Sequence, residues 1–342
     1  MFDIDFYRQF STLTYTGDVF SALESIRNPD PVVYNIETTN ACNMKCQMCP
    51  RTTMMTRPVE TMKPDLFEKI IDQIEPFTEQ QWDMWRQFVY ARYKIAPFEM
   101  NENHFFLYVI PQVIQLHGYG DPLLDKNMAT YVKMLSERGL KSYFSCNPAN
   151  INVEKVGEMM ANGLDYIKFS IESVDDNEHK QIRGSASNFT ESYKKILELL
   201  NIKRDFRHGT VIVITMLDLN RKNQAQGYLE LNRMFADKDV YIYLKSEDTL
   251  WYRKVYHPTK SIHWSEPCKH PWMSMTIKSN GEAAMCMEDY NNEIVLGNAK
   301  TESLKDIWNG EKYVDFRKQH IKNTKGIRCS DYCEMGTIGK FI

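Results

Sequence analysis

The sequence has no excess of basic residues. Its 42 lysines and arginines are slightly outnumbered by 45 aspartates and glutamates, which leaves a formal net charge of −3. Proteins that bind the phosphate backbone of DNA or RNA over an extended surface usually carry a strong positive charge. We therefore expect no nucleic-acid partner.

The sequence also lacks a long apolar run. No stretch reaches the length of a membrane-spanning helix, and the first residues, Met1 to Arg8, contain neither the basic start nor the apolar centre of a secretion signal. We expect no membrane contact and a cytoplasmic location. With 43% hydrophobic residues over 342 positions, the chain can still bury a core, and we expect one large domain and a smaller one.

The sequence also lacks the glycine-rich motif of dinucleotide-binding folds, although its pattern is that of a parallel sheet. Stretches rich in valine, isoleucine, tyrosine and phenylalanine alternate with amphipathic, helix-like stretches, which predicts a parallel sheet. The strand-like stretches are 32–36, 112–117, 141–145, 165–171, 210–216 and 240–244. No G-x-G-x-x-G sequence follows the first of them, which argues against a dinucleotide-binding fold. Periodicity alone leaves open a doubly wound sheet and a barrel.

Seven of the eight cysteines fall in two groups, and the first group follows the first strand-like stretch. Cys42, Cys46 and Cys49 form a C-x3-C-x2-C run, and no other Cys or His follows before His104. A zinc site would need a fourth ligand nearby. Three thiolates can instead hold three irons of a 4Fe-4S cluster and leave the fourth open. The alternative is that these cysteines are reduced and buried, or bind metal adventitiously.

The second group lies near the C-terminus and consists of Cys268, Cys286, Cys329 and Cys333. Four thiolates can close every iron of a 4Fe-4S cluster or form a four-coordinate zinc site, and ligand chemistry alone does not separate the two. The turn sequence Ser279-Asn280-Gly281 lies between two apolar stretches and predicts a hairpin. The repeating pattern ends after residue 252, which predicts a second domain.

The C-x3-C-x2-C run, followed by Pro50, resembles the cluster motif of radical S-adenosylmethionine (SAM) enzymes. The resemblance implies an α/β fold, a partial (β/α)6 barrel with SAM bound at the C-terminal ends of the strands. The G-x4-C pattern from Gly281 to Cys286 is similar to the hairpin of SPASM and shortened twitch domains. It implies a small α+β domain with a second 4Fe-4S cluster. A full SPASM domain has seven cysteines, so four indicate the twitch type.

The same resemblance implies the residues that bind SAM. The sequence from Gly118 to Pro122 is similar to the Gly-Glu-Pro motif that receives the SAM amino group, with Asp121 in place of Glu. Ser170 matches a serine that reaches the SAM ribose or carboxylate. Arg183 either pairs with that carboxylate or is a solvated loop charge. The SAM-binding residues expected are Met48, Gly120, Asp121, Pro122, Ser170 and Arg183.

Cys146 ends the third strand-like stretch and belongs to neither group. A lone cysteine is usually a small buried hydrophobe. The alternative is that its thiol gives a hydrogen atom to a substrate radical, as a cysteine does in radical epimerases.

The resemblance also implies a division of the chain. We expect an N-terminal extension over 1–30, a radical SAM barrel over 31–252 and a SPASM/twitch domain over 253–342. An aromatic-rich insertion over 77–110 interrupts the barrel pattern. We expect it to form an extra helix on the barrel flank or a dimer contact, with a lid or a membrane-surface helix as the alternatives.

The implied activity is reductive cleavage of SAM to a 5′-deoxyadenosyl radical, which abstracts hydrogen from a substrate carbon. The C-terminal cysteine spacing resembles the 2-deoxy-scyllo-inosamine dehydrogenase family, which implies dehydrogenation or epimerisation of a sugar or cyclitol alcohol. A flavodoxin- or ferredoxin-type reductant and two 4Fe-4S clusters are then expected. The alternatives are a maturase that modifies a ribosomally made peptide, and a non-catalytic iron-sulfur or zinc scaffold.

Overall fold

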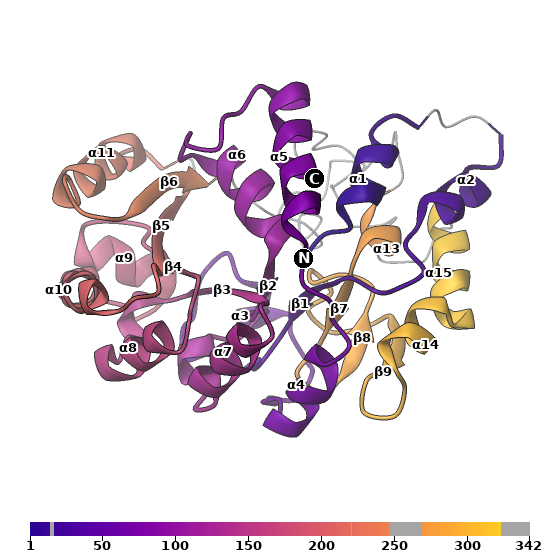
Figure 1. Cartoon of the computed structure of the whole chain (residues 1–342). Helices are drawn as coiled ribbons and strands as arrows, with labels where there is room; N and C mark the ends of the chain where they lie inside the picture. Colours follow the sequence, from indigo (N-terminus) through magenta and orange to yellow (C-terminus); the bar gives the residue numbers. More distant parts are fainter. Residues whose placement is uncertain (14–16, 220, 246–267, 323–342) are drawn as a thin grey trace.

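The computed structural model describes residues 1–13, 17–219, 221–245 and 268–322. Parallel strands form its centre, close to the positions predicted from periodicity (Figure 1). These strands are β1 (Val33–Ile36), β2 (Val113–Gln115), β3 (Lys141–Cys146), β4 (Tyr166–Ser170), β5 (Val211–Leu217) and β6 (Tyr241–Lys245).

The order of the strands decides between the two parallel folds. Each strand lies beside the next one in sequence, in the order β6-β5-β4-β3-β2-β1. A doubly wound sheet reverses its order beside its first strand, whereas a barrel keeps it sequential. The expected partial barrel is therefore confirmed.

Amphipathic helices cover the outer face of this sheet, where their apolar residues form one core with the outward side chains of the strands. The connecting helices are α3 (Pro50–Thr53), α4 (Pro64–Ile71), α7 (Met128–Glu137), α8 (Val153–Ala161), α9 (Asp176–Arg183), α10 (Phe189–Ile202) and α11 (Gln224–Met234). Side chains of Asn152, Asp175 and Asn188 cap the starts of α8, α9 and α10. Gly139 and Gly163 follow α7 and α8 with φ of 70° and 97°, as expected for residues that end helices.

The inner face of the sheet is covered by the N-terminal segment and the 77–110 insertion, which form a second core. Phe105 of the insertion lies 5.3 Å from Tyr143 and 5.5 Å from Tyr243, measured between ring centroids. The insertion therefore packs on the inner face of the barrel rather than on its flank, because the inward side chains of β3 and β6 are aromatic and an open barrel leaves them uncovered. The covering elements are α1 (Ile4–Phe10), α2 (Val19–Ile26), α5 (Glu79–Tyr93), α6 (Glu102–His104) and a π-helical turn (Phe105–Val109).

The C-terminal part extends the same sheet. β7 (Met275–Ile277) pairs parallel with β1, and β8 (Glu282–Ala284) and β9 (Val295–Asn298) continue antiparallel beyond it. Gly281, with φ of 86°, turns the predicted hairpin between β7 and β8. Figure 1 shows these strands beside β1, with α13 (His270–Met273), α14 (Leu304–Asn309) and α15 (Glu311–Ile321) next to them.

Short 3₁₀ turns lie at Ile110–Gln112, Pro122–Leu124, Pro148–Asn150 and Lys203–Asp205.

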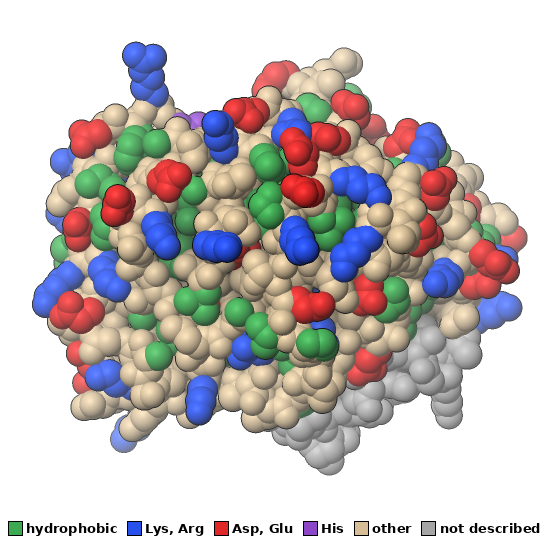
Figure 2. All heavy atoms as spheres, turned by 90° about the horizontal axis from the view of Figure 1, so that it is seen from below, with side chains coloured by type: hydrophobic (Ala, Val, Ile, Leu, Met, Phe, Trp, Pro, Cys, Tyr) green, Lys and Arg blue, Asp and Glu red, His purple; other side chains and the backbone are tan. Residues whose placement is uncertain are grey.

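None of the helices in the described residues has the length and apolar character that crossing a membrane requires. On the face seen from below, basic and acidic side chains are both scattered over the surface (Figure 2).

Candidate active site

The first cysteine group lies on the loop that follows β1, and the end of α9 fixes the backbone of this loop. The amide of Lys45 donates to the carbonyl oxygen of Arg183 at 3.1 Å, and the amide of Gln47 donates to that of Ile182 at 2.9 Å. Gly184 follows with φ of 99°, and an added Cβ there would lie 2.9 Å from the Lys45 nitrogen. The loop is therefore held against α9 by backbone contacts.

The three thiols of this loop are close enough to affect one another. Burial raises the pKa of Cys49 to about 11 and also raises the pKa of Cys42, and neighbouring thiols of the group add to both shifts. No three His, Cys, Asp or Glu side chains of the described residues converge as a single metal ion would require. Three sulfur ligands on one loop, each free to bind a separate iron, do fit an iron-sulfur cluster.

Arg183 lies between the cluster loop and a buried carboxylate. Its Nη1 is 3.6 Å from the Sγ of Cys46, and its Nη2 pairs with the carboxylate of Glu172, whose side chain is 1% exposed. Burial opposes the charged guanidinium, but Glu172 and Cys46 outweigh that effect and raise the pKa of Arg183. Among the described residues its buried Nε has no hydrogen-bond partner, which leaves one donor for a ligand.

Asp121 joins the ends of the first three strands. Its amide donates to the carbonyl oxygen of Ala41 at 2.7 Å. Its carboxylate accepts from the amides of Leu123 and Asn147 and from the side chain of Asn150, at 2.8 to 3.0 Å. Burial raises the pKa of Asp121, and these donors oppose the rise. In this structure the carboxylate is thus bound to protein donors and positions the loops around the site.

Gly120 lies where two backbones touch. A Cβ at this position would lie 2.2 Å from the carbonyl oxygen of Thr39 and 2.7 Å from the Cα of Asn40. Pro122, two residues later, begins a 3₁₀ turn.

We expect Gly120→Ala to lower the free energy of unfolding by about 3 kcal/mol or more, since the overlap is with backbone that cannot turn aside. Urea unfolding under anaerobic conditions measures the change. Gly227→Ala is the matched control, because no atom other than those of its chain neighbours and its own helix backbone lies within 4 Å of its Cβ position in α11. We expect that variant to be stabilised by about 0.5 to 1 kcal/mol. Equal stability of the two variants would contradict the close approach.

The structure separates the remaining predicted residues. Ser170 is half-buried at the end of β4, beside Thr215 of β5, and Met48 is half-buried in the cluster loop. Cys146 belongs to the outer core beneath the helices, with its Sγ 3.7 Å from the carbonyl oxygen of Lys168. This placement favours the interpretation of Cys146 as a small buried hydrophobe.

Two members of the second cysteine group lie close together. Burial raises the pKa of Cys268 to about 11 and raises the pKa of Cys286, on which the Cys268 sulfur acts in the same direction. The amide of Cys268 donates to Nε2 of His320 in α15 at 2.9 Å. Cys329 and Cys333 lie outside the described residues.

A buried ionic group joins the two parts of the sheet, and the sequence analysis missed it. Glu37, just after β1, is fully buried, pairs with Arg57 at 2.5 Å and accepts from the amides of Tyr119 and Ser279. Burial would raise the pKa of Glu37, but Lys278 and Arg57 outweigh it and lower the pKa. Glu37 stands in a polar stretch after a predicted strand, but Lys278 is far away in sequence, so no local signal indicates the pair.

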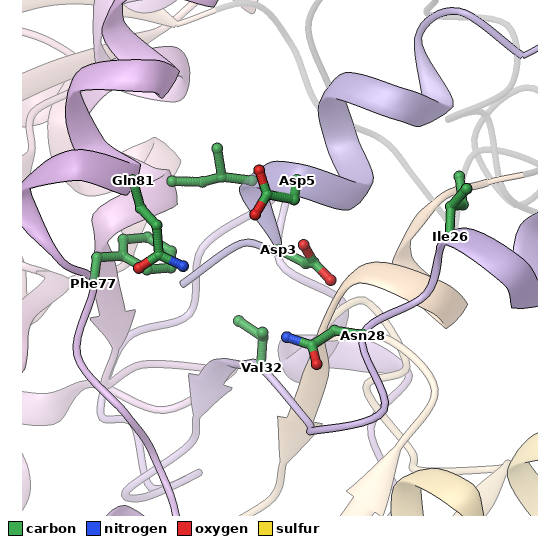
Figure 3. Close-up of a pocket in the computed structure, with 8 residues that line it drawn as sticks. Asp3, Asp5, Ile26, Asn28, Val32, Phe77 and Gln81 are labelled. Carbon is green, nitrogen blue, oxygen red and sulfur yellow. The ribbon is translucent and has the colours of Figure 1, made fainter.

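A separate cavity of about 180 Å³ lies beside the start of β1. Figure 3 shows its lining, drawn from the first residues of the chain, the segment before β1 and the start of α5. The lining residues are Asp3, Ile4, Asp5, Ile26, Asn28, Val32, Phe77 and Gln81. Burial, with a smaller contribution from the Asp5 charge, raises the pKa of Asp3 to about 6.

This shift gives stability a pH dependence. The folded state holds a proton on Asp3 that the unfolded chain, with a pKa near 3.8, releases, so stability falls as the pH rises from about 4 to 6. We expect Asp3→Asn to raise the free energy of unfolding by about 1 to 2 kcal/mol at pH 7.5, because asparagine keeps the helix cap without the charge. At pH 4 the two proteins should be nearly equal. A benefit of the same size at both pH values would contradict the shift.

Comparison with known proteins defines the class to which this fold and site belong. Residues 102–224 match the radical SAM superfamily, and residues 268–334 match SPASM, an iron-sulfur cluster-binding domain. The chain therefore carries a match to a radical SAM domain followed by a match to a C-terminal SPASM domain, and SAM and iron-sulfur chemistry belong to domains of this class.

The similar proteins are distant in sequence. The chain is 19% identical over 302 residues to the S-adenosyl-L-methionine-dependent 2-deoxy-scyllo-inosamine dehydrogenase of Niallia circulans, over 87% of this chain and 90% of that protein. It is similar to the crystal structure of BtrN in complex with AdoMet and 2-DOIA, with a TM-score of 0.50 and 18% identity, over 90% of this chain and 93% of that one.

Two further structures share the fold. Streptococcus suis SuiB bound to precursor peptide SuiA gives a TM-score of 0.56 at 14% identity, over 92% of this chain and 72% of that one. Native anSMEcpe with bound AdoMet gives 0.55 at 12% identity, over 90% and 89%. The expected radical SAM resemblance and fold class are confirmed.

Proposed function

We propose that this enzyme dehydrogenates a carbinol of a sugar or cyclitol, with epimerisation as the redox-neutral variant. The observation that carries the proposal is the pairing of β1 with β7. The first strand leads directly into Cys42, Cys46 and Cys49, and the hairpin that begins with β7 leads to Cys286. The first cysteine group and Cys286 of the second group therefore follow neighbouring parts of one sheet, which suits the removal of an electron from substrate. The name of the Niallia circulans relative, a dehydrogenase, supports the same reaction class.

The residues that would hold the cofactors follow from the site. Cys42, Cys46 and Cys49 would hold the cluster that binds SAM. A second 4Fe-4S cluster would take Cys268, Cys286, Cys329 and Cys333 as ligands. SAM on a reduced cluster supplies a 5′-deoxyadenosyl radical that removes hydrogen from an unactivated carbon.

The chain's own residues orient SAM in this proposal. Ser170 at the end of β4 would reach its ribose or carboxylate, and the unpartnered Nε of Arg183 would donate to the carboxylate. Gly120 allows the close approach of two backbones, and Asp121 with Pro122 sets the loop that would receive the amino group. Met48 would pack beside SAM from the cluster loop.

The junction around Glu37 has a second part in this proposal. The hydroxyl of Tyr119 donates to the carboxylate of Glu288 at 2.8 Å, and its ring lies 6.0 Å from that of Tyr290. Lys278 donates to the carbonyl oxygen of Met287, next to Cys286, at 3.1 Å. These contacts join the segment around Cys286 to the loop after β2. In this proposal they keep Cys286 near the strand ends of the barrel, where an electron would leave the substrate radical.

Anaerobic reconstitution followed by iron and sulfide analysis tests the cluster count. We expect about eight irons per chain for two cubanes, and four or fewer if the second site holds zinc. Dithionite and SAM should then release 5′-deoxyadenosine. With a substrate deuterated at the carbinol carbon, deuterium should enter 5′-deoxyadenosine, and a ketone should form. Absence of the nucleoside from fully loaded protein would overturn the proposal in favour of a non-catalytic scaffold.

A peptide substrate is the second candidate, and one observation favours it. Phe98 and Met100 of the insertion are 81% and 63% exposed, which offers an apolar surface for a peptide. A gene for a short precursor peptide beside this one would support that function, whereas genes for sugar transferases or aminotransferases would support the first.

We propose a flavodoxin or ferredoxin in the cytoplasm as the natural reductant, which dithionite replaces in the assay.

A further inference from the structure

A group of hydrogen-bond donors lies on the inner face of the sheet, around the ring of Tyr143. We call Gln115, His117, Lys168 and Tyr243 the inner-face donors. Gln115 stands opposite Tyr143 in the β2–β3 register, and the His117 ring lies 5.1 Å from the Tyr143 ring. Gln115, Lys168 and Tyr243 belong to β2, β4 and β6, and His117 follows the end of β2. Lys168 lies two residues before Ser170 on β4, and Tyr243 is in register with Ser170 through Thr215 of β5.

Lys168 is the charged member of the group. Its Nζ lies 4.9 Å from the ring centroid of Phe105 and 5.4 Å from that of Tyr143, and the residue is 8% exposed. Aromatic faces stabilise an ammonium group without neutralising its charge. A positive charge is thus held among the aromatic rings of the inner face.

His117 is a neutral donor. Burial, together with the ammonium groups of Lys168 and Lys245, lowers the pKa of His117 to about 3. Its Nδ1 accepts the amide of Ser145 at 3.2 Å, so the single ring proton is on Nε2. The ring can therefore donate a hydrogen bond through Nε2 but cannot serve as a base there. His117, just after β2, and Lys245, at the end of β6, are both half-buried.

Two further polar atoms of the group are buried without a hydrogen-bond partner in the described part of the chain. They are the hydroxyl of Tyr243, a residue 2% exposed, and the Nε2 of Gln115, a residue 4% exposed. An unpaired buried polar group costs about 1 to 3 kcal/mol. Such a cost is sustained most readily where a ligand or ordered water supplies the missing partner.

We propose that the substrate carries an oxyanion, a phosphate or a carboxylate, which the inner-face donors bind. This inference rests on the proposed action on a hydroxylated small molecule and names the class of that molecule. An ammonium, an imidazole N–H and a phenol hydroxyl match the acceptor oxygens of an oxyanion. An ammonium group has no acceptor atom for a cationic amine, so an aminocyclitol such as the inosamine named for the Niallia circulans relative is a poor match.

The experiment measures binding by isothermal titration calorimetry on the reconstituted full chain with SAM present. The probes are myo-inositol 1-phosphate, glucuronate, myo-inositol and glucosamine, which separate phosphate, carboxylate, neutral and cationic ligands. We expect one of the two anions to bind about tenfold or more tightly than the neutral and cationic probes. Lys168→Met should remove that preference, and Tyr243→Phe, which keeps the ring, should weaken anion binding several-fold. Lys133→Met is the matched control, since that lysine is exposed on α7.

Each result decides the matter. Equal binding of all four probes, tighter binding of glucosamine, or unchanged anion binding in both variants overturns the inference. If Lys168→Met weakens SAM itself and leaves the preference for anions intact, Lys168 serves the cofactor and the inference is also wrong. Release of 5′-deoxyadenosine from SAM and dithionite is measured in parallel. Its persistence while anion preference is absent would sink this inference alone and leave the proposed function in place.

Discussion

Replacement of Cys46 by alanine is expected to abolish the release of 5′-deoxyadenosine and to reduce the bound iron from about eight to about four per chain. Cys46 is the buried member of its group, and its sulfur is the one that faces Arg183. Removing it leaves two thiols for a cluster that needs three. The readouts are iron and sulfide content, the electron paramagnetic resonance signal with and without SAM, and chromatography of the nucleoside.

Cys146→Ala is the matched control for this experiment, because Cys146 lies on the opposite face of the sheet in the outer core. We expect full iron content, unchanged nucleoside release and a loss of stability of about 1 kcal/mol. Full iron in Cys46→Ala would show that this cysteine is not a ligand. A loss of turnover in Cys146→Ala with its iron intact would restore the hydrogen-donor role.

Arg183→Met is expected to lower the free energy of unfolding by about 3 to 5 kcal/mol, because it leaves the carboxylate of Glu172 buried and unpaired. Glu172 also accepts from the amide of Leu217 at 2.8 Å, so it cannot turn toward solvent without breaking a second contact. The same variant removes a donor from the Cys46 sulfur, and we expect the first cluster to become harder to reduce. Anaerobic urea unfolding and a redox titration followed by spin resonance measure the two effects.

The double variant Glu172→Gln with Arg183→Met tests whether the loss of stability comes from the unpaired charge of Glu172 or from the lost packing of the arginine side chain. Without the carboxylate no uncompensated charge remains, so the double variant should be more stable than Arg183→Met alone. If the single variant costs under about 1 kcal/mol and mainly weakens SAM binding, Arg183 acts on the SAM carboxylate and not as a partner of Glu172.

The barrel and the first cysteine group were predictable because their signals are local. The stretch 141–145 contains two adjacent aromatic residues, a type enriched in strands, and became β3 with one residue added. The C-x3-C-x2-C run needs only eight residues to be recognised. The turn at Gly281 was equally local, since its neighbours on both sides are strand-like.

The contacts that position the site were not predictable, because they join segments far apart in the chain. Arg183 was expected either to pair with the SAM carboxylate or to be a solvated loop charge, whereas the structure places it on Glu172 and Cys46. Glu37 and Lys278 approach each other only when β7 pairs with β1. The packing of Phe105 against Tyr143 likewise depends on the open inner face of the barrel, which no periodicity in residues 77–110 describes.

The face of the sheet on which the Cys146 side chain lies could have been predicted from the sequence. Side chains alternate along a strand, so Phe144 and Cys146 share one face and Tyr143 lies on the other. The polar residues of the same strand set, among them Lys168, indicate which face is turned away from the helices.

Because β7 hydrogen-bonds to β1, the loop that carries the first cysteine group and the hairpin that leads to Cys286 have no hinge between them at this seam. Electron transfer by a movement of the C-terminal part relative to the barrel is incompatible with the strand pairing that joins them. We therefore expect the distance between the first cysteine group and Cys286 to stay constant during turnover. Cutting the chain before β7 would also remove the strand that pairs with β1 on one side. The sheet edge exposed at β1 would then be prone to self-association. The two parts should therefore be expressed and studied as one chain.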